Sequence, residues 1–90
     1  MKQLELYIDG ASKGNPGPAG IGVIICDNNT VIKNISYYIG NTTNNVAEYM
    51  ALIYALQEAL ILKAQSVKIN TDSQLLYKQI KKEYHIKDNK

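Results

Sequence analysis

The fold is decided by two alternating apolar runs, LELYID at residues 4–9 and VKINTD at residues 67–72, and by the stretch between them. Alternation of apolar and polar residues is typical of a half-buried β-strand. Each run closes on an aspartate, Asp9 or Asp72, directly before turn-forming residues. A third carboxylate, Glu48, lies in an apolar helical stretch, where a charge is costly unless it has a task. We therefore interpret the three carboxylates as residues that converge in space.

The composition is that of one small globular domain. The chain has 90 residues, 46% of them hydrophobic and 20% charged, and a net charge of +2. These values are ordinary for a soluble protein, so we expect a single domain over residues 1–90. Lysines crowd the last thirteen positions, at Lys78, Lys81, Lys82, Lys87 and Lys90. They form either a solvated helix face and tail or a patch that binds phosphates.

The single cysteine, Cys26, excludes an internal disulfide and fits a reducing compartment. Because it continues the apolar run at residues 21–25, we interpret it as a buried strand thiol rather than a nucleophile. The sequence opens without a charged-then-apolar leader, and no uncharged run approaches the length that spans a membrane. We therefore expect a cytoplasmic protein that has no membrane partner.

The periodicities predict the element order β-β-β-α-β-α. Strands are predicted at residues 3–9, 21–26, 31–39 and 67–71, and helices from residues 42–45 to about Leu62 and from Ser73 to about Tyr84. The second and third strands flank turn formers at residues 27–30, which predicts an antiparallel hairpin that ends at Gly40 and Asn41. The first and fourth strands and the helix between them form a βαβ unit, so these strands should be parallel. The fold class is a mixed α/β sheet.

The segment GASKGNPGPAG at residues 10–20 is rich in Gly and Pro, so we expect an irregular loop. It matches neither Gly-x-x-x-x-Gly-Lys nor Gly-x-Gly-x-x-Gly, and a strand rather than a helix follows it. Two interpretations stay open. Its glycines and peptide N–H groups admit a nucleic-acid backbone, or it is only a wide connection between strands.

The first helix carries two apolar stripes. A wide apolar face is predicted from residues at helical spacing, namely Val46, Met50, Ile53, Leu56 and Leu60. Glu48 heads the other stripe, which continues through Ala51, Leu52 and Ala55 and should face the sheet. By itself, Glu48 is equally explained as a first-turn acid favoured by the helix dipole or as the partner of Asn45 in a capping box. The aspartates at two strand ends favour a carboxylate that points toward them, where sites form in such sheets.

Three converging carboxylates without matching Lys or Arg repel one another, so they predict a divalent cation. An all-oxygen ligand set suits Mg²⁺ or Mn²⁺ rather than zinc, and His85 has no Cys or His partner. Hard cations of this kind accept phosphate oxygens as further ligands, and two of them can activate a water against a phosphodiester. The sequence therefore predicts metal-assisted phosphodiester chemistry.

Three segments closely resemble the signatures of type 1 ribonuclease H proteins, in the family's order and spacing. They are YIDGASKGNPGPAGIG at residues 7–22, TNNVAEYMAL at residues 43–52 and TDSQ at residues 71–74. The sequences of these segments are most similar to those of the short bacterial and archaeal branch. The resemblance covers nearly the whole chain, from about Leu4 to Tyr84.

The resemblance implies endonucleolytic cleavage of the RNA strand of RNA–DNA hybrids with two Mg²⁺ or Mn²⁺ ions. It implies that Asp9, Glu48 and Asp72 are catalytic carboxylates and metal ligands. It also implies a set of nucleic-acid contacts, which are backbone groups at Gly10, Ala11 and Ser12, hydrogen bonds from Asn15, Asn44, Asn45 and Gln74, and a DNA-phosphate contact at Thr43. The amide contacts include the 2′-hydroxyls that distinguish RNA from DNA.

The chain departs from the family pattern, because members continue past the second helix with another strand and helix that carry a fourth carboxylate. We therefore expect a truncated ribonuclease H-like domain that lacks this last strand and helix. One alternative is a nucleic-acid-binding module that has lost turnover, and another is an actin-like nucleotide-binding domain, although a second phosphate loop is missing. The uncovered edge of the strand at residues 67–71 and an apolar patch predict a homo-oligomer.

Overall fold

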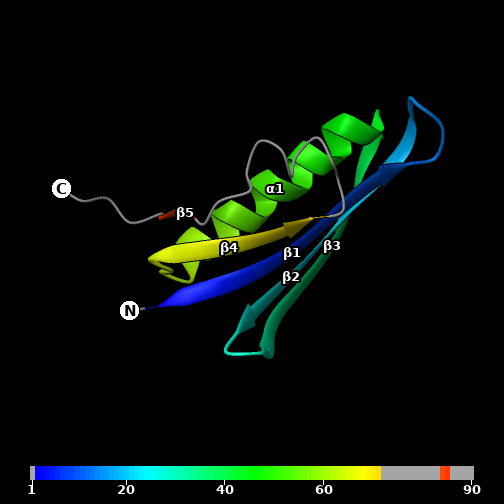
Figure 1. Ribbon diagram of the computed structural model, residues 1–90. Coiled ribbons are helices and arrows are strands. Elements are labelled where there is room, and N and C mark those ends of the chain that lie inside the picture. The colour runs from blue at the N-terminus through cyan, green and yellow to red at the C-terminus, as the bar shows by residue number, and fades with distance from the viewer. Residues whose placement is uncertain (1, 72–83, 86–90) are drawn as a thin grey trace.

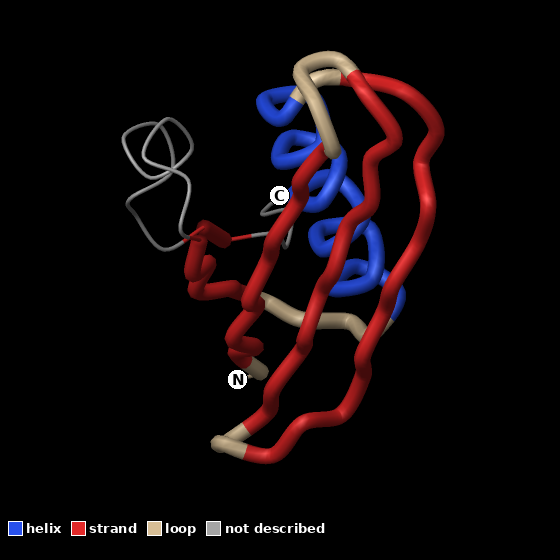
Figure 2. Tube along the Cα trace, turned by 90° about the vertical axis from the view of Figure 1, so that its right-hand side faces the viewer, coloured by secondary structure: helices blue, strands red, loops and turns tan. Residues whose placement is uncertain are grey.

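The computed structural model describes residues 2–71 and 84–85 as one sheet with a helix along one face (Figures 1 and 2). The elements are β1 (Gln3–Ser12), β2 (Gly17–Asp27), β3 (Thr30–Thr42), α1 (Asn44–Ile61), β4 (Ser66–Thr71) and β5 (Tyr84–His85). The strands lie in the order β3-β2-β1-β4-β5. The predicted mixed α/β sheet is therefore confirmed.

The pairing of the strands also follows the prediction. β2 pairs antiparallel with both β1 and β3, which forms the predicted hairpin beside β1. β4 pairs parallel with β1, from Gln3 opposite Ser66 to Ile8 opposite Thr71. Because α1 connects these two parallel strands, the βαβ unit is confirmed as the centre of the fold.

We expected the glycine-rich segment at residues 10–20 to be an irregular loop, but most of it belongs to β1 and β2. The β1–β2 ladder continues from Asp9 opposite Gly22 to Ser12 opposite Ala19, so only residues 13–16 connect the strands. The hairpin likewise continues past Gly40 to residue 42, and its turn consists of two residues, Asn28 and Asn29, both with positive φ. Ladder hydrogen bonds satisfy the backbone, and they outweigh the modest cost of glycine in a strand.

The core lies between α1 and the sheet. Alternate residues of β1, Leu4, Leu6 and Ile8, are buried against the helix. The buried face of α1 is mostly alanine and comprises Ala47, Ala51, Leu52, Ala55 and Ala59. The predicted stripe below Glu48 therefore faces the sheet. The predicted wider apolar face lies at the margin of the core: Val46, Ile53 and Leu60 are 45%, 52% and 56% exposed, whereas Met50 and Leu56 are half-buried and pack against the core.

The end of the chain differs from the prediction where the structure describes it. The second helix, predicted from Ser73 to about Tyr84, lies outside the described residues except at Tyr84, which is in a strand. β5 pairs antiparallel with β4, with Tyr84 opposite Val67 and His85 opposite Ser66. The edge of β4 is therefore partly covered rather than open. The clustered lysines from Lys78 onward lie outside the described residues. Within the described part of the chain, α1 is not long and apolar enough to span a bilayer.

Candidate functional site

The candidate site lies where β1 continues beyond its neighbour β4. The last pair between these parallel strands joins Ile8 and Thr71, whereas the pairing of β1 with β2 continues to Ser12. Among the described residues, β1 therefore has a partner on only one side from Asp9 onward. We had predicted that Asp9 ends the first strand, but it lies three residues before the end of β1. We call this place, beside Asp9 at the end of β4, the recess.

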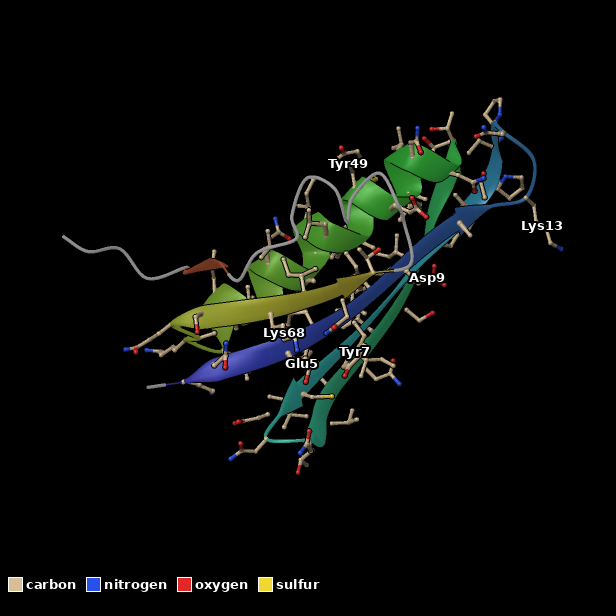
Figure 3. All side chains as sticks on the ribbon, in the orientation of Figure 1. Glu5, Tyr7, Asp9, Lys13, Tyr49 and Lys68 are labelled. Atoms are coloured by element: carbon tan, nitrogen blue, oxygen red, sulfur yellow. The ribbon has the colours of Figure 1, made fainter. Side chains whose placement is uncertain are left out.

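Asp9 approaches this recess from the face opposite α1. The side chains of β1 alternate, so Asp9 and Tyr7 are exposed on that face while Ile8 is buried against the helix (Figure 3). Asp9 borders an open hollow of about 710 Å³, which is also lined by Tyr7, Asn34 and Asn70. The carboxylate is therefore accessible to a ligand from this side.

Glu48 lies on α1, which covers the other face of the sheet from the one on which Asp9 is exposed. The N-cap is Thr43, whose Oγ1 accepts a hydrogen bond from the Val46 N–H at 3.3 Å. Glu48 therefore begins the second helical turn, and Asn45 is not a cap to which it could bond. The capping-box explanation is excluded, and the dipole explanation is weak because its effect falls off within the first turn. A half-buried carboxylate without a capping role is consistent with a functional one.

Gly10 brings the two carboxylate-bearing elements together. A Cβ atom at this buried position would lie 2.3 Å from the carbonyl oxygen of Ala47 and 2.7 Å from the backbone nitrogen of Glu48. The residue after Asp9 thus touches the peptide before Glu48. Within the described part of the chain, the one salt bridge joins Lys33 to Glu58, so neither Asp9 nor Glu48 has a cationic partner.

The third predicted carboxylate, Asp72, lies outside the described residues, as does Gln74. Among the described residues, no group of three or more His, Cys, Asp or Glu side chains is placed to hold a metal ion. The structure therefore brings together the backbones that carry Asp9 and Glu48 and leaves the full predicted ligand set untested.

Three of the predicted nucleic-acid contacts form a hydrogen-bonded clamp. The Ser12 N–H donates to Asn44 Oδ1 at 2.7 Å, and the Ser12 hydroxyl lies 3.0 Å from the same oxygen. The Asn44 N–H donates in turn to Asn15 Oδ1 at 3.0 Å. Each of the two side-chain carbonyl oxygens accepts a hydrogen bond within the clamp, whereas the NH₂ groups of Asn15 and Asn44 donate none within it. The clamp ties the 13–16 connection to the start of α1.

The remaining contact candidates lie around this clamp. Ala11 and Asn45 are exposed, and Thr43 is half-buried as the helix cap. Sequence reasoning missed Lys13, an exposed cation in the 13–16 connection, which projects at this end of the molecule (Figure 3). It also missed the packing role of Gly10. The position of Lys13 between Ser12 and Asn15 was the signal that could have identified it.

A second polar group lies on the open face, farther from the end of β1. Asn70 Nδ2 donates to Glu5 Oε2 at 3.2 Å and to the Leu6 carbonyl at 3.3 Å, which ties β4 to β1. A hydrogen bond with Glu5 raises the pKa of the Tyr7 hydroxyl above its usual value, because it favours the neutral phenol. Tyr7 therefore stays neutral at physiological pH beside the Asp9 position.

Comparisons with known proteins identify relatives of the whole chain. The RNase H family model matches residues 1–90. Ribonuclease HI of Halobacterium salinarum is 42% identical over 79 residues, which are 87% of this chain and 40% of that protein. Ribonuclease H of Wigglesworthia glossinidia brevipalpis is 47% identical over 83 residues, 90% of this chain and 50% of that protein. The chain thus spans half or less of the length of these curated relatives.

Solved structures share the fold. The crystal structure of RNase H1 from Halobacterium salinarum matches with a TM-score of 0.82 and 40% identity, covering 88% of this chain and 61% of that one. The crystal structure of LC11-RNase H1 in complex with RNA/DNA hybrid matches with a TM-score of 0.81 and 42% identity, covering 96% and 66%.

Proposed function

This chain belongs to the RNase H family, and we propose that it is an endonuclease that cleaves the RNA strand of RNA–DNA hybrids. The observation that carries the proposal is the contact at Gly10, which joins the backbones of Asp9 and Glu48 beside the Ser12–Asn44–Asn15 clamp. This end of the molecule therefore offers both carboxylates and amide donors. The LC11-RNase H1 structure, a relative of the same fold, contains an RNA/DNA hybrid.

We propose that Asp9, Glu48 and Asp72 hold two Mg²⁺ or Mn²⁺ ions when substrate is bound. The donor chemistry fits these metals, because Asp9 and Glu48 offer only hard oxygen atoms and have no cationic partner among the described residues. When bound, such ions activate a water and stabilise the leaving oxygen of a phosphodiester. The chain contributes rigidity, since Asp9 is held by a paired strand and Glu48 by a helix capped at Thr43.

The clamp determines what kind of substrate group the asparagines can recognise. With both Oδ1 atoms occupied, Asn15 and Asn44 present NH₂ donors, which require acceptors on the ligand. The 2′-hydroxyl oxygens of RNA and the acceptor atoms in the minor groove have this chemistry. Lys13 adds a positive charge for a backbone phosphate nearby. We propose that Ala11, Thr43, Asn45 and Gln74 complete this contact surface.

The test is incubation of the purified chain with labelled RNA–DNA hybrid, with and without Mg²⁺. Mg²⁺-dependent cleavage of the RNA strand alone is the expected result. A matched control is Asp27→Asn, which removes an aspartate at the hairpin end of β2, far from the recess. Retention of hybrid without cleavage would indicate the binding module instead. Failure to bind hybrid under any metal condition would refute both.

A further inference from the structure

We propose that Gly10 is a positioning residue whose missing side chain sets the separation between β1 and α1, and thereby between Asp9 and Glu48. The inference rests on the proposed metal-dependent function, because the separation matters only if both carboxylates serve one site. It assigns Gly10 a task other than the backbone contact with nucleic acid that the family resemblance implies. The geometry of the strand and the helix supports this assignment.

Glycine is needed at this position for space and not for backbone conformation. The glycines with positive φ in the described part of the chain are Gly14 and Gly40, so any residue could adopt the backbone of Gly10. A Cβ on Gly10 would, however, meet the Ala47 carbonyl oxygen at 2.3 Å and its carbonyl carbon at 2.4 Å. Both are backbone atoms, so a rotamer change cannot relieve the contact.

The helix is also unable to swing away freely. Its buried face consists mostly of small residues, including the fully buried Ala47 and Ala51, so the backbones lie close together. The Asn44 side chain holds the start of α1 to Ser12, and Glu58 near its end pairs with Lys33 at 2.9 Å. An added methyl group would therefore force a local displacement at Ala47 and Glu48.

The size of this displacement determines its effect. Ordinary contact begins at 3.4 Å, so the peptide before Glu48 would have to move by about 1 Å relative to β1. Ligand sets must be held within about 0.5 Å of their productive geometry. A shift of about 1 Å typically costs about 100-fold in rate. We therefore expect Gly10→Ala to disrupt a shared metal site while preserving the fold.

The experiment compares the parent chain with three variants by calorimetric titration with Mn²⁺ alone, at a temperature where circular dichroism shows each to be folded. Gly10→Ala is the test. Val31→Ile is the matched control, because it also adds one methyl group, at a position on β3 that is 58% exposed and lies at the hairpin end of the sheet, away from Asp9. Ala51→Val is a second test, because it widens the same helix–sheet gap one turn further along α1. Hybrid cleavage is measured in parallel.

We expect Gly10→Ala to bind Mn²⁺ at least about 10-fold more weakly and to cleave about 100-fold more slowly, with Val31→Ile close to the parent. A folded Gly10→Ala with parental Mn²⁺ affinity would overturn the inference. If Gly10→Ala does not fold, Ala51→Val decides by the same criterion. A parent chain that binds no Mn²⁺ would refute the proposed function itself. Parental Mn²⁺ affinity in both Gly10→Ala and Ala51→Val would instead refute only the positioning role of Gly10.

Discussion

Asp9 is an exposed carboxylate on a central strand, with no cationic partner among the described residues. If it holds metal ions, its charge supplies much of the electrostatic stabilisation. We expect Asp9→Asn to lower hybrid cleavage by at least about 100-fold and to leave the fold intact. The loss of carboxylate repulsion should raise the melting temperature without metal, measured by circular dichroism. Retention of most of the parental activity would show that Asp9 is not a catalytic ligand.

Asn44 has two separable tasks, which two substitutions distinguish. Asn44→Asp keeps an oxygen for the Ser12 N–H but loses the NH₂ donor, so we expect near-parental stability and weaker hybrid binding. Asn44→Ala loses both, so its free energy of unfolding should also fall, by about 0.5–1 kcal/mol. Urea denaturation and hybrid titration measure the two effects. Parental hybrid affinity in Asn44→Asp would argue against the amide as a substrate donor.

At the scale of elements, α1 packs through alanine and exposes larger residues. We expect Ala55→Leu to destabilise the fold by about 1–3 kcal/mol, because a fully buried position has no room for the added atoms. Ile53→Lys, at a position that is 52% exposed, should change stability by no more than about 0.5 kcal/mol. Urea denaturation of both variants checks this. The reverse order would mean that α1 packs through its other face.

The 13–16 connection and the start of α1 together carry the proposed nucleic-acid contacts, and their chemistry predicts how binding depends on salt and sequence. In the proposed complex, the amide donors and Lys13 contact backbone and minor-groove groups, so affinity should fall steeply with salt and show little base preference. We expect RNA–DNA hybrid to compete well against a DNA duplex of the same sequence in fluorescence anisotropy. Equal affinity for both duplexes across several sequences would contradict the assignments of Asn15, Asn44 and Asn45.

At the scale of the whole molecule, the two edges of the sheet are the places where a second copy of the chain could pair. β5 covers β4 only at Ser66 and Val67 among the described residues, and β3 is the other edge strand. Unpaired strand edges pair readily with another chain. We propose that the chain forms a dimer or higher oligomer through a sheet edge, which light scattering over a concentration series would detect. A stable monomer at high concentration would refute this proposal.

The sequence by itself determined the element types and their order up to β4. Alternation in residues 4–9 and 67–71, with a helical run between them, required parallel strands joined by a helix, and the asparagines at 28 and 29 fitted a tight hairpin. The capping signal at residues 42–45 was also sufficient, since Thr43 is the cap. These features depend on short-range periodicity and local hydrogen bonding, which a single sequence displays directly.

The tertiary structure alone decided where the strands end and why Gly10 is glycine. Glycine-rich residues near Gly20 became strand because a neighbouring ladder satisfied their backbone, which local propensity cannot indicate. Ala47 and Ala51 are fully buried, at positions where the sheet approaches the helix too closely for larger side chains. Each of these outcomes depends on what lies opposite a residue in space, and that information is absent from its neighbours in the chain.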